Sequence, residues 1–192
     1  MTSRRFSKTT LRTARFVLAA AAFSLLCACA ALPDDAPVVE QLDTETGVTV
    51  TRLGRPIEMY RETFQQDPAG RFAFIGPFET NLMGARELFL WIAVPAEPVG
   101  DAVPEIELNG APLTLGTPGK AADFAGLHKS PYKIPTPWST MYYFKIDAAL
   151  VEQLAQATKL TIRVLEPAKS GTVKTVFATD VVDTRLKDFS TR

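Results

Sequence analysis

Short alternating runs of apolar and polar residues, broken by frequent turn residues, constrain this chain more than any other feature. The runs begin near Gly47, and the whole chain holds 11 glycines and 14 prolines. Because successive side chains of a strand point to opposite faces, such runs predict strands with one buried face, whereas 87–94 is apolar on both faces and suits a central strand. The expected strands are 46–53, 71–78, 87–94, 105–108 with its return 113–115, 139–146, 159–165 and 172–179, with a weaker one at 56–62.

Two local signals add a hairpin and a helix. Asn109-Gly110 separates two alternating runs, and both residue types tolerate the positive φ angles of a tight hairpin turn. Asp147 is suited to cap a helix over 148–157, where Leu150, Leu154 and Ala157 recur at the spacing of one helical face. The sequence therefore predicts a single β-rich domain over 47–192, a mainly β fold. We expect a β-sandwich of about seven or eight short strands with one short helix, with a β-barrel as the second choice.

The N-terminal segment has the three parts of an export signal. Residues 1–28 contain five basic residues and no acidic one, and Phe16 to Leu26 is an apolar run of eleven residues. A basic start, a short apolar middle and small residues after it are typical of a cleaved secretory signal peptide. The alternative is an uncleaved anchor, although the 17 mostly apolar residues of 16–32 are barely enough to cross a bilayer.

The stretch Leu26-Cys27-Ala28-Cys29 resembles the lipobox of bacterial lipoprotein precursors. The resemblance implies that residues 1–28 are removed as a signal peptide and that Cys29 becomes the lipidated first residue. It also implies a membrane anchor through this lipid and, since Ala30 is not Asp, an outer-membrane location facing the periplasm. Ser3-Arg4-Arg5 loosely resembles a twin-arginine signal, but general secretion is the expected route.

Residues 29–46 are expected to connect the lipid to the domain. The stretch 30–46 holds five acidic residues, no basic residue and two prolines, and it shows no sustained period. This composition predicts an extended tether with a reach of at most ~60 Å, at ~3.3–3.6 Å per residue. In the alternative interpretation, Val38, Val39 and Leu42 dock on the domain instead.

The residues expected to follow the signal peptide carry no signature of catalysis or metal binding. They hold one histidine, His128, and one cysteine, Cys29, so a zinc site built from the three or four usual ligands is not expected. Phosphate-binding loops and nucleophile elbows are absent from the sequence. Residues 29–192 carry 16 basic and 21 acidic side chains, a balance that argues against nucleic acid as a partner. We therefore expect a protein with no cofactor, no metal and no enzymatic activity.

The stretch 126–143 is the candidate binding loop. It gathers His128, Tyr132, Trp138 and Tyr142 with several prolines, and aromatic rings with a polar group suit contact surfaces. In the alternative interpretation these rings plug one end of the sandwich. Arg86, before an apolar strand, is expected to pair with a carboxylate or a ligand anion.

Three functions follow from these features. The first is a non-enzymatic, lipid-anchored cell-envelope protein that binds an envelope protein partner or supports the envelope. The second is a lipoprotein that binds a small ligand or glycan in a pocket at the end of the sandwich. The third is an enzyme with His128 as its base.

Overall fold

The computed structural model describes residues 36–62, 72–95, 99–133, 139–168, 171–180 and 183–191. Contacts divide the chain into Met1–Asp34, all of which lies outside the described residues, and Asp35–Arg192. The candidate lipidation residue Cys29 and the candidate binding residue Trp138 also lie outside the described residues.

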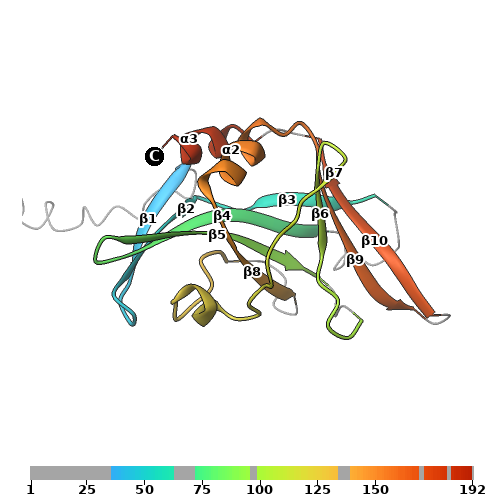
Figure 1. Cartoon of the computed structure of the whole chain (residues 1–192), viewed down its shortest axis with the longest axis horizontal. Helices are drawn as coiled ribbons and strands as arrows, with labels where there is room; N and C mark the ends of the chain where they lie inside the picture. The colour runs from blue at the N-terminus through green and yellow to red at the C-terminus, as the bar shows by residue number, and fades with distance from the viewer. Residues whose placement is uncertain are drawn as a thin grey trace, which may run out of the picture. The chain divides into compact units, whose positions relative to one another are not determined.

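Ten antiparallel strands make up most of the described part of Asp35–Arg192 (Figure 1). The strands are β1 (Val38–Asp43), β2 (Val48–Leu53), β3 (Ile57–Arg61), β4 (Phe72–Leu82), β5 (Ala85–Val94), β6 (Glu105–Leu108), β7 (Ala111–Pro112), β8 (Thr140–Ile146), β9 (Leu160–Ala168) and β10 (Gly171–Thr179). The helices are the short 3-10 helix η2 (Ala122–Ala125), α2 (Ala148–Gln156) and α3 (Thr184–Ser190).

The sheet branches at β4. One edge of β4 pairs with β5, and β5 pairs with β8. The other edge pairs with β3 in its first half and with β2 in its second half, so β2 and β3 form one strand that is interrupted at residues 54–56. From this interruption β1 continues the sheet beside β2, while β10, β9, β6 and β7 continue it beside β3.

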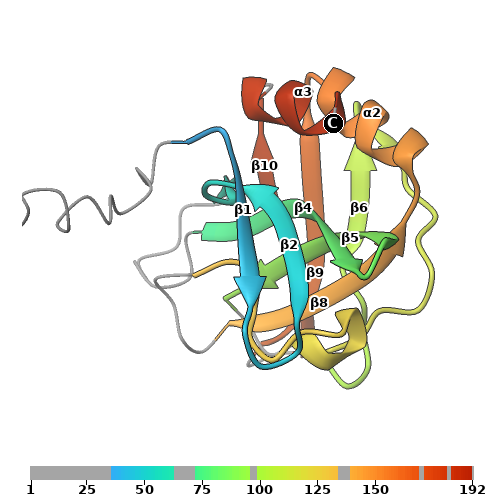
Figure 2. The same cartoon turned by 90° about the vertical axis from the view of Figure 1, so that its left-hand side faces the viewer.

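These two groups of strands enclose one apolar core, and the predicted β-sandwich is confirmed. The pairing of the described strands does not close on itself, so the second choice, a closed barrel, is wrong. Helices α2 and α3 lie together at one end of the strands (Figure 2). The largest fully buried side chains are Trp91, Tyr132, Tyr142, Tyr143, Phe78, Phe89, Phe144, Phe177, Leu53, Met59, Ile75 and Leu90.

The predicted tether is wrong in its second half, because residues 38–43 form the edge strand β1. Its pairing with β2 runs from Val38 opposite Leu53 to Asp43 opposite Val48. Val38 is buried, as the docking alternative expected, whereas Leu42 is exposed. The sheet therefore begins at Val38, and only residues 30–37 separate it from Cys29.

The predicted Asn109-Gly110 turn and the helix after Asp147 are confirmed, although the return strand of the hairpin is 111–112 rather than 113–115. Asn109 and Gly110 adopt φ angles of 51° and 81° in the β6–β7 turn. The Asp147 carboxylate accepts a 2.8 Å hydrogen bond from the Leu150 N–H and so caps α2. Of the predicted apolar face, Leu154 and the C-cap residue Ala157 are buried and Leu150 is partly buried, and Val151 and Ala155 are buried in addition.

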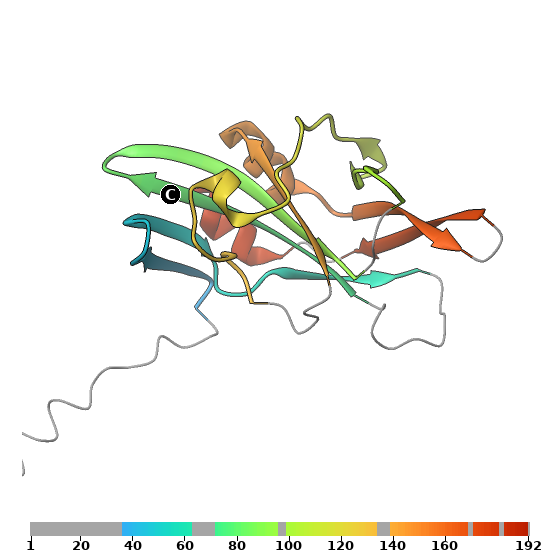
Figure 3. The same ribbon diagram turned by 90° about the horizontal axis from the view of Figure 1, so that it is seen from below.

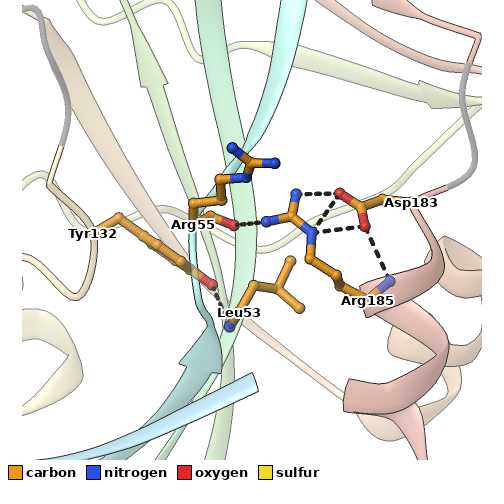
Figure 4. A network of polar contacts seen from close by, with 5 residues as sticks. All are labelled: Leu53, Arg55, Tyr132, Asp183 and Arg185. Atoms are coloured by element: carbon orange, nitrogen blue, oxygen red, sulfur yellow. Dashed lines mark hydrogen bonds and ion pairs between the residues drawn. The ribbon is translucent and has the colours of Figure 1, made fainter. Parts of the chain in front are cut away.

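Beyond the one predicted helix, the structure has a second, α3, at Thr184–Ser190. Asp183 accepts a 3.0 Å hydrogen bond from the Arg185 N–H, and Leu186 and Phe189 are buried. The Arg185 side chain also pairs with Asp183 and donates a 2.9 Å hydrogen bond to the Arg55 carbonyl oxygen in the β2–β3 interruption (Figure 4). Burial of Leu186 and Phe189 and this link hold α3 against the β2–β3 interruption.

Candidate functional site

Two of the candidate binding residues, Tyr132 and Tyr142, are core residues. Tyr132 is 2% exposed, and its ring centroid lies 5.1 Å from that of Trp91. Tyr142 is 1% exposed, and its hydroxyl donates a 3.3 Å hydrogen bond to the Ala102 carbonyl oxygen. Burial raises the pKa of both phenols. Neither ring has a free face for a partner, so the structure favours the alternative in which these rings fill the end of the sandwich.

Tyr132 has a specific structural role at the interruption between β2 and β3. Its hydroxyl accepts a hydrogen bond from the buried Leu53 N–H at 3.2 Å and donates one to the Pro77 carbonyl oxygen at 2.5 Å. The first of these bonds is drawn in Figure 4. The ring lies so close to Gly76 that a Cβ atom there would be 2.6 Å from it. The Tyr132 hydroxyl thus takes the place of a direct backbone hydrogen bond between Leu53 on β2 and Pro77 on β4.

This arrangement explains how β4 continues through Gly76-Pro77. The N and C=O groups of one residue in an extended strand point to the same edge. Because the Pro77 carbonyl faces Tyr132, the Pro77 nitrogen also faces the gap, where no N–H is needed. The proline therefore costs the sheet no hydrogen bond.

His128, unlike these two tyrosines, is exposed. Its backbone N–H donates a 2.8 Å hydrogen bond to Asp43 Oδ2, while Asp43 Oδ1 accepts from the N–H groups of Glu45 and Thr46. The bond from His128 is the main cause of the lowered pKa of Asp43. A cavity of about 150 Å³ beside these residues is also lined by Arg52 and Ser130.

The bond between Asp43 and His128 joins the candidate binding loop to the β1–β2 turn through the histidine backbone. The hydrogen bond that fixes this turn therefore does not need the imidazole. Within the described residues, no group of three His, Cys, Asp or Glu side chains is placed to hold a metal ion.

A hollow of about 490 Å³ lies between the sheet and the two helices. We call it the helix-end cavity. Its lining comes from three sides: Thr51 on β2, Glu79 on β4, Arg86, Glu87 and Leu88 on β5, Lys145 and Ile146 on β8, Ala148 and Val151 on α2, and Phe189 and Ser190 on α3.

The strand register sets the sheet side of this cavity. Thr51 lies opposite Glu79, Glu79 opposite Leu88, and Leu88 opposite Ile146. Residues directly opposite each other in antiparallel strands share one face, so this row crosses four strands on the face toward the helices. Val151 and Phe189 come from the helices, and the apolar members of the row meet them there.

Two ion pairs supply the polar part of the lining. Arg86 Nε and Nη2 each lie 2.8 Å from an oxygen of Glu79, and Lys145 Nζ lies 2.5 Å from Glu87 Oε1. The expected carboxylate partner of Arg86 is thus Glu79, and this bond raises the pKa of the guanidinium. The Glu79 side chain is 14% exposed and that of Arg86 56%, so the pair has one buried and one accessible partner.

The lining of the helix-end cavity combines ion-paired charges with apolar side chains. Both carboxylates in its lining are held by cations, and histidine and cysteine are absent from the lining residues. The apolar side chains of Leu88, Val151 and Phe189 beside these charged groups suit a ligand with both apolar and polar parts. Sequence patterns missed this site because each lining strand contributes one or a few residues, and only Arg86 was singled out.

Comparison with protein-family models, curated proteins and solved structures gives no match to this chain. None of the helices in the described ranges is both long and apolar enough to span a membrane.

Proposed function

We propose that the protein is a lipid-anchored, non-enzymatic binding protein of the cell envelope, exposed to the periplasm from the outer membrane. The export signal and the lipobox-like Leu26-Cys27-Ala28-Cys29 support the anchor. The helix-end cavity is the observation that carries the binding role, because apolar side chains and two ion pairs share its lining, a mixture that is typical of protein interfaces. The occupant in this proposal is a segment of an envelope protein.

A small amphipathic ligand is the second candidate. Ligand pockets usually measure ~300–1,000 Å³ and combine apolar walls with a few polar groups. The cavity of about 490 Å³, with Leu88 and Phe189 beside the Arg86–Glu79 pair, falls in this range. This candidate shares the site with the first and differs in what occupies it.

The anchor is tested by intact mass and membrane fractionation of the native protein beside a Cys29→Ser variant. A lipid-sized mass on a chain that starts at residue 29, together with membrane association lost in the variant, is the expected result. An unmodified, freely soluble wild-type chain would remove the anchor from the proposal.

The site is tested by filling the cavity. Ala148 is exposed and lines the cavity, whereas the neighbouring Ala149 is exposed and does not line it. Ala148→Trp is expected to abolish cross-linking to the envelope partner, while Ala149→Trp preserves it at equal thermal stability. Equal cross-linking by both variants would place the partner elsewhere. A small molecule released from the wild type, but not from Ala148→Trp, would favour the second candidate.

A further inference from the structure

The turn between β4 and β5 has an unusual residue at its tip. Leu82 pairs with Ala85, so Met83 and Gly84 form a two-residue turn with φ angles of 52° and 94°. The Met83 side chain is fully exposed and Leu82 is 47% exposed. We call Leu82 and Met83 the apolar tip.

The fold itself gives no reason for methionine at this position. Two-residue turns with positive φ at both positions favour Asn-Gly, because most side chains are strained there. The β6–β7 turn has nearly the same angles and uses Asn109, whose Oδ1 accepts hydrogen bonds from Thr158 and Lys159. Among the described residues, Met83 and Asn109 alone are non-glycine residues with positive φ. The fully exposed Met83 thus keeps an unfavourable backbone conformation beside a second exposed apolar residue, Leu82.

The apolar tip lies close enough to the start of the sheet to reach a membrane that holds the Cys29 lipid. Nine residue steps separate Cys29 from Val38, a length of at most ~30 Å. Five steps along β1 from Val38 to Asp43 cover ~17 Å, and the β1–β2 turn lies beside the β4–β5 turn because Thr49 pairs with Asn81. The segment from Cys29 to Val38 can therefore span a longer distance than the one from Val38 to the β1–β2 turn. In Figure 1 the β4–β5 hairpin projects on the side where β1 lies.

We propose that the apolar tip is a second membrane contact, with Leu82 and Met83 inserted among the lipid headgroups of the bilayer that holds the Cys29 lipid. This inference rests on the proposed function for its anchor. An apolar residue gains free energy at the boundary between headgroups and acyl chains, and a second contact fixes an orientation that one flexible tether cannot. Arg86 follows the tip closely on β5, so this orientation also places the helix-end cavity near the bilayer.

The test uses the chain that starts at Cys29, with intact mass measured first to show the lipid. The protein is reconstituted in phosphatidylcholine vesicles, because the neighbouring turn carries Asp43 and Glu45 and an anionic surface would oppose contact. An environment-sensitive fluorophore is attached to Met83→Cys or to the control Val173→Cys. Val173 is also an exposed apolar residue and lies in the β9–β10 hairpin, which projects opposite the β4–β5 hairpin (Figure 3).

The expected result is a blue-shifted emission at residue 83 and a solvent-like emission at residue 173. Solvent-like emission at both positions would overturn the proposal. So would a shift at residue 83 that occurs only after an envelope protein is added, since this would assign the tip to a protein contact.

Met83→Asn gives a second readout without a label. Asn suits the turn, so the melting temperature is expected to rise, whereas amide exchange of residues 82–86 on vesicles is expected to become several-fold faster than in the wild type. A rise in melting temperature with unchanged exchange would make Met83 only a tolerated turn residue.

If intact mass shows no lipid, the proposed anchor fails by itself. The chain is then coupled through the Cys29 thiol to a maleimide lipid, and the same amide exchange measurement is made. Protection of residues 82–86 on these vesicles would support the tip contact without the natural anchor, and no protection would overturn it.

Discussion

The Tyr132 hydroxyl donates a hydrogen bond to the Pro77 carbonyl oxygen at 2.5 Å and thereby occupies the place of a rung in the sheet. On its other side the same oxygen accepts the Leu53 N–H, a group 79 residues away in sequence. The side chain thus separates β2 from β4 at the point where β2 gives way to β3. The branching of the sheet depends on this contact.

Removal of this hydroxyl should destabilise the fold. In Tyr132→Phe the Leu53 N–H and the Pro77 carbonyl stay buried without a partner, which costs about 1–3 kcal/mol. We expect a loss of that size in the free energy of unfolding, measured by urea titration. The matched control is Tyr60→Phe, because Tyr60 is exposed and should show a change near zero. Equal effects of the two substitutions would contradict the role of the hydroxyl.

The close approach of Tyr132 to Gly76 predicts a second effect. A Cβ atom at residue 76 would lie 2.6 Å from the ring, and the ring has no space to withdraw because it packs on Trp91. Overpacking of this kind costs about 1–3 kcal/mol, so Gly76→Ala should lower the unfolding free energy by that amount. Gly116→Ala is the control, since no atom lies within 4 Å of a Cβ there. A neutral Gly76→Ala would show that the ring can move.

The bond between Asp43 and the His128 N–H predicts a pH dependence. The folded chain lowers the pKa of the Asp43 carboxyl, mainly through this bond. The ionised carboxylate therefore stabilises the folded state above the pKa that it has in the unfolded chain. This contribution is lost as the pH falls through the folded pKa.

The measurement is an NMR titration of the Asp43 carboxyl together with the His128 amide. We expect both resonances to move with one midpoint below the ordinary aspartate value. His128→Ala should retain most of the lowering, because the donor is the backbone N–H. Return of Asp43 to an ordinary pKa in that variant would assign the effect to the imidazole instead.

The cap of α2 predicts a loss of stability when its acceptor is removed. Asp147→Ala deletes the oxygen that accepts the Leu150 N–H, and a lost cap costs ~1 kcal/mol. Asp147→Ser keeps an acceptor and should stay within a few tenths of a kcal/mol of the wild type. Thermal unfolding of the two variants checks the prediction. Similar melting temperatures for both would show that burial of Val151 and Leu154 alone holds the helix.

The β-strands could be predicted from the sequence because alternation is a local property. The runs around Val48 and Ile106 each show which residues face the core, and Asn109-Gly110 marks its own turn. The edge strand β1 escaped prediction because its middle residues are exposed and acidic or polar, so only Val38 carries a clear signal of burial. Its assignment depends on the partner strand β2, which supplies the backbone hydrogen bonds.

By itself, the sequence determined the β-rich region and the helix capped by Asp147, since each of these rests on residues close together along the chain. Only the tertiary structure decided that Tyr132 is a core residue and that Pro77 is tolerated inside a strand. It also decided that Thr51, Glu79, Leu88 and Ile146 meet in one row beneath α2 and α3. The physical reason is that strand register and burial are set by pairing between distant segments, and the periodicity of any single segment does not encode them.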